Sequence, residues 1–219
     1  MNLSDIKLRV KRQFGDESGV QITDDDIMRW ANDGQRDIVL RNESVLQTTS
    51  TTNSVEGQQA YGFPANLLVL RSIHYKRVDG DQGFYKLQGM SYTEFDEHID
   101  GWDGTTYNPG YPMVYTTYAD QILLFPVPVS SETDNIKIIY SRQPTELTSD
   151  VDEIDLPVAY HNTVVDYCLT KAYQLDEDWN AAGYLAQEYT SSVNLNKERE
   201  NWGNQEVYPR ITVDIEDMW

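Results

Sequence analysis

The first forty residues carry helical periodicity. Ile6, Val10 and Phe14 recur every four residues, which predicts a helix that begins near Ser4 and ends at Gly15. A second helix is predicted after residue 23, where a threonine N-cap and an aspartate three residues later have the spacing of a capping box. Its apolar stripe covers residues 27–38, so the helix is expected to end near residue 41 or 42.

Helical periodicity returns late in the chain. Pro157 suits the first turn of a third helix, whose apolar pairs recur every four residues between 164 and 173. A fourth helix is predicted from about Asp178 to about Asn201. Its inward positions are expected at 181, 185, 189 and 193. The short gap between these two helices predicts an antiparallel hairpin.

The middle of the chain has strand and turn composition, rich in Thr, Val, Ile, Tyr and Phe with frequent Gly, Asn, Asp and Pro. Residues 79–81 are expected to form a hairpin turn, Ala119-Asp120 a second turn, and residues 91–99 a short helix. Candidate strands cover residues 45–52, 58–63, 69–78, 84–88, 113–118, 121–125 and 136–140. Short strands at this spacing are typical of a small sandwich or barrel.

The predicted fold class is therefore α+β. Residues 1–44 and 151–202 are expected to form one antiparallel helical bundle, and residues 45–150 an antiparallel β sandwich or barrel inserted into it. Residues 203–219 are expected to form an extended C-terminal arm. Ile211, Val213 and Ile215 alternate with polar residues there, so this arm can add a strand to a partner's sheet, with Trp219 as an anchor.

Charge and cysteine content narrow the class of protein. The 219 residues carry a formal net charge of −19, which argues against a nucleic-acid-binding module. The single cysteine, Cys168, excludes an internal disulfide and fits a reducing compartment. No signal-peptide pattern and no apolar run long enough for a membrane span is present, so a soluble protein is expected.

Signals for chemistry are weak. His74, His98 and His161 are far apart in sequence and belong to no metal-ligand motif. The local cluster Asp96-Glu97-His98 with Asp100 is more readily explained as a solvated helix end than as a metal site. No nucleophile motif or phosphate loop is present, and Cys168 lies in an apolar stripe. The sequence predicts no enzyme, no cofactor and no metal.

An ordered series of short motifs points to a family. Each motif is weak alone, but unrelated proteins seldom share the whole order. The motifs are Tyr61-Gly62-Phe63-Pro64, Pro112-x-x-Tyr115, the run 122–128 with its Pro-x-Pro end, the strand 136–140 followed by Pro144 and Leu147, Leu156-Pro157-x-x-Tyr160-His161, and Ala172-Tyr173 with Asp176. Between residues 24 and 201 the chain thus resembles the head-to-tail adaptor, or connector, proteins of tailed bacteriophages, especially the short-tailed type. Phe63 departs from the leucine that is commoner there.

This resemblance implies a structural virion protein made in the host bacterial cytoplasm. It implies a homo-oligomeric ring, a dodecamer, that lies below the portal protein, extends the DNA channel and receives the tail nozzle or tail tube. The bundle would then touch the portal and the β block would face the tail. DNA would pass through without sequence-specific binding, and no membrane would be involved.

Two surface clusters remain candidates for contacts. Lys7, Arg9, Lys11 and Arg12 form a basic cluster that can pair with the protein's own carboxylates, with a neighbouring subunit or with DNA in the channel. The aromatic residues Trp102, Tyr107 and Tyr111 lie in an expected loop that can face the tail. The alternatives left open are another phage tail or baseplate protein, a carbohydrate-binding module using the aromatic loop, and an acidic hydrolase.

Overall fold

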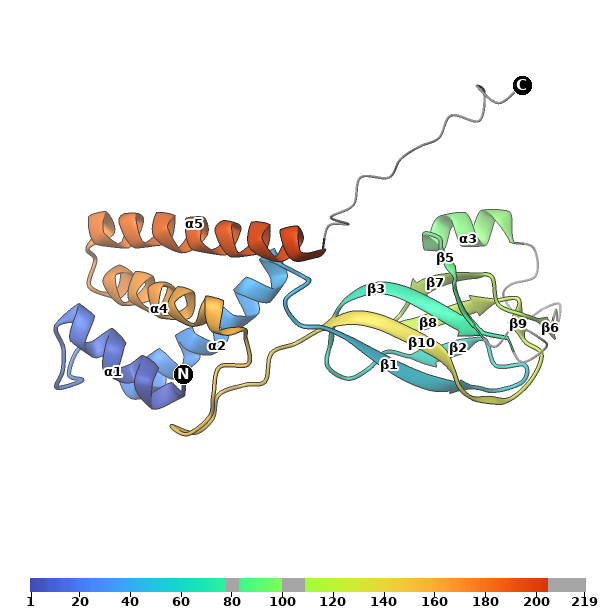
Figure 1. Ribbon diagram of the computed structural model, residues 1–219, viewed down its shortest axis with the longest axis horizontal. Helices are drawn as coiled ribbons and strands as arrows, with labels where there is room; N and C mark the ends of the chain where they lie inside the picture. Colours follow the sequence, from blue (N-terminus) through green and yellow to red (C-terminus); the bar gives the residue numbers. More distant parts are fainter. Residues whose placement is uncertain (78–82, 100–108, 205–219) are drawn as a thin grey trace, which may run out of the picture. The chain divides into compact units, whose positions relative to one another are not determined.

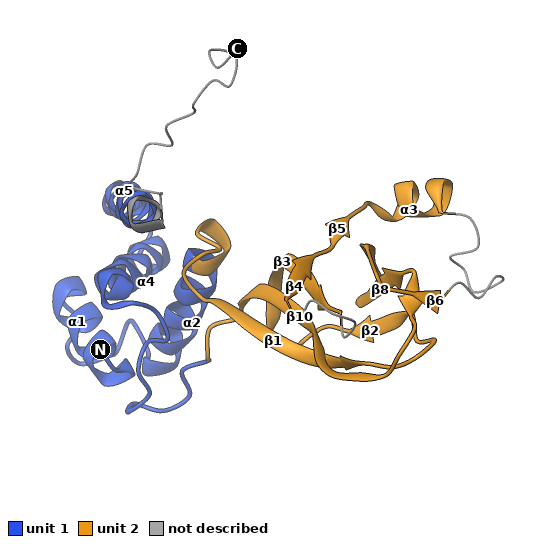
Figure 2. Cartoon of the chain, turned by 45° about the vertical axis from the view of Figure 1, so that its right-hand side comes forward, with its two compact units in different colours: residues 1–38, 146–219 blue, residues 39–145 orange. Residues whose placement is uncertain are grey.

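The computed structural model describes residues 1–77, 83–99 and 109–204, and it confirms the α+β class. The chain divides into two compact units (Figure 2). Unit 1 consists of residues 1–38 and the chain from residue 146 onward, and unit 2 consists of residues 39–145. The two ends of the chain thus contribute to the same unit, and unit 2 is formed by the segment between them.

Unit 1 is helical (Figure 1). Its first helix starts two residues earlier than the sequence predicts, because Asn2 and not Ser4 is the N-cap: the Asn2 side chain accepts the N–H of Asp5, whose carboxylate accepts the N–H of Asn2. Gly15, with a φ of 92°, ends this helix as predicted. The helices of this unit are α1 (Leu3–Phe14), α2 (Asp24–Arg41, its last residues in unit 2), the 3-10 turn η1 (Val158–Tyr160), α4 (His161–Leu175) and α5 (Trp179–Asn204).

The second helix begins as its sequence predicts. Thr23 Oγ1 accepts the N–H of Asp26, and the Asp26 carboxylate accepts the N–H and the hydroxyl of Thr23. This reciprocal pair satisfies donors that a helix start leaves free. The interior of unit 1 is formed by apolar side chains of all four helices, among them Ile6, Val10, Ile27, Ala31, Val164, Cys168, Ala182 and Val193.

Helices α4 and α5 form the predicted hairpin. Glu177 adopts a positive φ of 61° in the turn, and the Asp178 carboxylate then accepts the N–H groups of Asn180 and Ala181 at the start of α5. Ala182, not Ala181, is the buried alanine of the first turn. The inward stripe of α5 is therefore displaced by one residue there, although Tyr189 and Val193 are buried as expected.

Unit 2 consists of two four-stranded sheets, a two-stranded pair and the short helix α3 (Tyr92–His98) (Figure 1). The first sheet has the order β1 (Gln47–Ser54), β10 (Glu132–Arg142), β3 (Leu67–Lys76), β4 (Phe84–Lys86) and is antiparallel. The second has the order β2 (Ala60–Gly62), β8 (Gln121–Phe125), β7 (Val114–Tyr118), β5 (Gln88–Gly89). The remaining pair is β6 (Pro109–Gly110) with β9 (Val127–Pro128).

Both sheets contribute to one apolar core. Ile73, Tyr75, Ile136 and Ile138 come from the first sheet and Tyr61, Ile122 and Leu124 from the second, all at most 5% exposed. The expected wholly antiparallel arrangement is wrong in detail, since the pairs β5–β7 and β6–β9 are parallel. The predicted strand 84–88 is also two strands. Leu87 lies between them and is buried, with its N–H bonded to the carbonyl of Ile73, so the chain crosses from one sheet to the other there.

Two of the three local features predicted for this unit are present. Ala119 and Asp120 both have positive φ, 48° and 59°, and join β7 to β8. Helix α3 is capped by Ser91 in a capping box with Glu94, and its Phe95 packs edge-on against Phe125 of β8. The predicted turn at 79–81 lies outside the described residues, between the paired strands β3 and β4.

Candidate partner-binding surfaces

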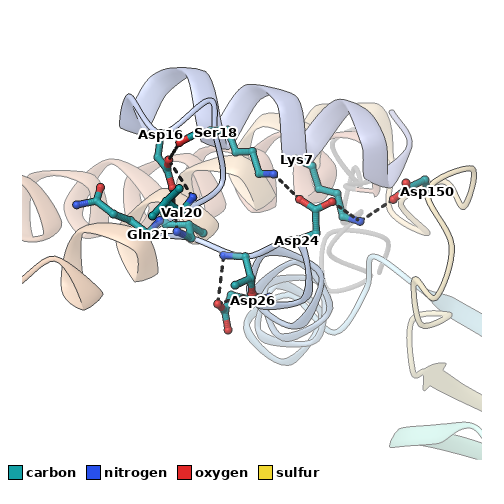
Figure 3. A network of polar contacts seen from close by, with 11 residues as sticks. Lys7, Asp16, Ser18, Val20, Gln21, Asp24, Asp26 and Asp150 are labelled. Carbon is teal, nitrogen blue, oxygen red and sulfur yellow. Dashed lines mark hydrogen bonds and ion pairs between the residues drawn. The ribbon is translucent and has the colours of Figure 1, made fainter.

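The basic cluster of α1 is largely engaged inside unit 1 (Figure 3). Lys7 Nζ lies 2.6 Å from a carboxylate oxygen of Asp150 and 3.7 Å from one of Asp24, and Lys11 Nζ lies 2.5 Å from the other oxygen of Asp24. Burial lowers the pKa of Lys7, but the two carboxylates outweigh it and the pKa is raised. The Lys11 hydrogen bond holds the pKa of Asp24 below its usual range. These two lysines therefore join α1 to the start of α2 and to residue 150.

The two arginines of the cluster lie elsewhere on the same helix. Arg9 and Arg12 are exposed, and Arg9 donates to the side-chain oxygen of Asn162 in α4 at 3.0 Å. Arg9 also lines a groove of about 460 Å³, together with Gln13, Asn162, Val165, Asp166, Glu188 and Ser192. Lys7 and Lys11 thus share Asp24 within unit 1, whereas the exposed Arg9 and Arg12 can reach a partner.

The loop between α1 and α2 is held by Asp16, a residue that the sequence analysis did not single out (Figure 3). Its carboxylate accepts the N–H groups of Val20, Gln21 and Ile22 at 2.7–3.2 Å and the hydroxyl of Ser18. These hydrogen bonds, that of Ile22 first, place the pKa of Asp16 far below its usual range. The signal in the sequence was an aspartate followed by Ser18, a pattern typical of a side-chain-capped turn.

Of the three aromatic residues Trp102, Tyr107 and Tyr111 of the expected loop, only Tyr111 lies within the described residues. This residue is half-buried, packs against the core of unit 2, and lies with its ring centroid 5.2 Å from the guanidinium carbon of Arg77. The guanidinium carbon of Arg77 also lies 4.9 Å from the ring centroid of Tyr85. Trp102 and Tyr107 lie outside the described residues, as do Ile211, Val213, Ile215 and Trp219 of the expected arm.

The three histidines and the single cysteine lie on different parts of the fold and do not form a common site in the described part of the chain. His74 is on β3, His98 ends α3, and His161 at the start of α4 bonds the carbonyl of Leu156 at 3.0 Å. Within residues 1–77, 83–99 and 109–204 no three metal-ligating side chains come together. Asp100 of the weak acid–histidine cluster lies outside those ranges. Burial raises the pKa of the Cys168 thiol, which disfavours the reactive thiolate.

None of the described helices combines the length and the apolar character that crossing a membrane requires. Such a helix needs about twenty mostly apolar residues.

Comparison with known proteins identifies the family. Residues 1–210 match the family model described as SU10 adaptor protein. A search of curated proteins finds no significant match. The family match extends on both sides of the region 24–201 that carries the resemblance, and so includes α1 and the beginning of the expected arm. The chain belongs to the SU10 adaptor protein family, a family of phage head-tail adaptors.

Proposed function

We propose that this protein is a structural, non-enzymatic component of the virion that forms a ring below the portal. The ring extends the DNA channel and offers the attachment surface for the tail nozzle or tail tube. The observation that carries the proposal is the family match over residues 1–210, nearly the whole chain. The resemblance of the motifs further favours a dodecamer, with unit 1 toward the portal and unit 2 toward the tail.

The decisive experiment mixes the purified protein with portal rings of the same phage and images the product by electron microscopy. A second ring stacked coaxially on the portal supports the proposal and gives its symmetry. If intact portal rings remain bare at micromolar adaptor, the proposal is wrong, and binding to tail components and to polysaccharide would be measured next.

The expected arm is proposed to grip the portal or a neighbouring subunit. The alternation of Ile211, Val213 and Ile215 supports strand addition to a partner's sheet edge, and Trp219 is the proposed anchor. A chain that ends at Trp202 should bind portal rings more weakly than the full chain. Equal affinity of the two proteins would rule the arm out as a portal or subunit contact.

The two surface clusters have different proposed roles. Lys7 and Lys11 are neutralised within unit 1, so a channel or subunit contact of the basic cluster would fall to Arg9 and Arg12. Trp102, Tyr107 and Tyr111 are proposed to face the tail. Replacing Arg9 and Arg12 by Gln tests the first role through assembly on the portal, and replacing Trp102 and Tyr107 by Ala tests the second through nozzle binding.

A further inference from the structure

One row of side chains crosses the first sheet of unit 2. Lys137 of β10 lies directly opposite His74 of β3, and His74 lies directly opposite Lys86 of β4. Directly opposed residues of antiparallel strands project to the same face, with their Cβ atoms about 5 Å apart. In the neighbouring row Ile136 lies opposite Tyr75, and both are fully buried in the core. The Lys137–His74–Lys86 row therefore projects to the outer face of the sheet.

A further cation and an aromatic ring belong to the same outer face. Lys76 lies opposite Phe84, two residues along the strands from the His74–Lys86 pair, so both project to the same side. Phe84 is 41% exposed, and Lys137 Nζ lies 5.6 Å from the centroid of its ring. We call the surface formed by His74, Lys76, Phe84, Lys86 and Lys137 the basic face.

The positive charge of the basic face is not balanced within the described part of the chain. Ion pairs with carboxylates engage Lys7, Lys11, Arg29, Arg36 and Arg71, but among described residues no carboxylate lies within 4.0 Å of the three lysines of the basic face. Burial, and then the charges of Lys137 and Lys86, lower the pKa of His74. Among the described residues, the lysines of the basic face thus lie near one another without a neutralising carboxylate, in a chain whose net charge is −19. This is expected of a surface that meets an acidic partner.

We propose that the basic face binds the acidic helical unit of a second copy of this chain, and so joins neighbouring subunits of the ring. The inference rests on the proposed ring and names one surface that closes it. Charge complementarity identifies the occupant, because most carboxylates of the chain lie in unit 1, with exposed runs such as Asp176–Asp178.

The same charges define the symmetry of the contact. If two basic faces met in an isologous dimer, like charges would oppose one another. A contact between a basic face and an acidic unit joins two different surfaces, and such a heterologous contact generates a ring when the rotation between successive copies closes. The lysine stems and Phe84 can add apolar contact beneath the charges.

The test compares the double variant Lys86→Glu/Lys137→Glu with the full-length wild type. Portal rings are incubated with increasing adaptor and imaged, at about 0.05 M and about 0.5 M salt. We expect the variant to need about tenfold or more protein to form the second ring, and high salt to weaken the wild type toward the variant. Lys86→Arg/Lys137→Arg, which keeps both positive charges of the basic face, is the matched control and should assemble as the wild type does.

Thermal unfolding first establishes that each variant folds. Rings formed by the folded Glu variant at wild-type concentrations would overturn the proposal while leaving the adaptor function intact. The proposal is also overturned if both proteins form rings but only the wild type binds a DNA duplex in a mobility-shift assay. The basic face would then be a DNA-binding surface. If the wild type itself forms no ring on the portal, the proposed function fails. Sedimentation at low salt then tests the basic face independently of the portal. Self-association of the wild type that the Glu variant lacks would support the proposed subunit contact, and equal behaviour of the two proteins would overturn it.

Discussion

The side-chain amide of Asn32 forms two hydrogen bonds with the backbone of Leu147, one to its carbonyl and one from its N–H. Asn32 Nδ2 donates to the Leu147 carbonyl at 3.0 Å, and the Leu147 N–H donates to Asn32 Oδ1 at 2.8 Å. One turn further along α2, Gln35 Oε1 accepts the N–H of Asp155 at 2.8 Å. Gln35 is fully buried and Leu147 is 2% exposed, so these amides satisfy backbone groups of a largely buried segment.

Replacing Asn32 by Asp should destabilise the protein by about 1–3 kcal/mol. The carboxylate can still accept from the Leu147 N–H, but it loses the donor and faces the Leu147 carbonyl with a negative charge. Urea unfolding at pH 7 measures the change. Asn194→Asp, at an exposed position of α5, is the control and should change the free energy of unfolding by less than about 0.5 kcal/mol. Equal effects of the two substitutions would mean that the Leu147 contact contributes little.

Two helical glycines should respond in opposite ways to alanine. A Cβ on Gly183 of α5 would meet nothing within 4 Å, so Gly183→Ala should stabilise by about 0.5–1 kcal/mol through helix propensity. A Cβ on Gly34 of α2 would lie 3.1 Å from Cδ1 of Tyr167, whose ring also contacts Tyr189. Gly34→Ala should therefore gain nothing or lose stability. Thermal unfolding of both variants checks this, and a gain at Gly34 equal to that at Gly183 would show that the Tyr167 ring yields freely.

Local features of the fold could be predicted where the residues that form them are close in sequence. The capping box of Thr23 and Asp26 and the turn at Ala119-Asp120 each depend on a few neighbouring side chains and backbone angles, and both are present. The sequence does not distinguish Asn2 from Ser4 as the N-cap of α1, because both are good capping residues and only the geometry selects Asn2.

Pairings between distant segments could not be predicted. The ion pair of Lys7 with Asp150 and the double hydrogen bond of Asn32 with Leu147 depend on how the segment after unit 2 returns to the helices. The basic face was likewise hidden, because Lys86 and Lys137 meet only through the register of β4, β3 and β10. A polar residue on a helix also does not reveal from sequence alone whether it is solvated or bonds buried backbone.

The imidazole of His74 should titrate below the ordinary value near 6.5. Burial comes first among the causes, followed by the positive charges of Lys137 and Lys86, and each disfavours the protonated ring. The unfolded chain therefore binds this proton more readily than the folded protein does, so His74 subtracts stability as pH falls through about 6.5. Proton NMR of the ring gives the pKa, and Lys86→Gln/Lys137→Gln should raise it. An unchanged pKa in that variant would show that burial alone sets it.

The loop between α1 and α2 should depend on the charge of Asp16. The hydrogen bonds of Asp16 depress its pKa in the folded state. The charged side chain therefore stabilises the fold at pH values above the pKa of the unfolded chain, near 3.8, and this contribution is lost as the pH falls below that value. Asp16→Asn should lower the melting temperature at pH 7, and the difference from wild type should shrink toward pH 2. Glu17→Gln, on the exposed neighbour, is the control. A constant difference at all pH values would assign the effect to geometry and not to charge.

Asp166 of α4 should give protein stability the opposite dependence on pH. Burial first, and then the negative charge of Glu188, raise its pKa to about 6. Between about 3.8 and 6 the folded protein holds a proton that the unfolded chain has released, so stability is lost as pH rises through 6. Asp166→Asn removes this cost and should stabilise the protein by about 1–3 kcal/mol at pH 8, but little at pH 4.

Urea unfolding of the wild type and of Asp166→Asn at pH 4, 6 and 8 measures this dependence, with Asp176→Asn at an exposed position as the control. Glu188→Gln should give part of the same gain, because it removes the second cause of the raised pKa while leaving the burial of Asp166 unchanged. A gain from Asp166→Asn that is independent of pH would come from packing or hydrogen bonding of the amide. A loss at pH 8 would mean that the charged carboxylate is stabilised in the groove beside Arg9, so that the raised pKa is wrong.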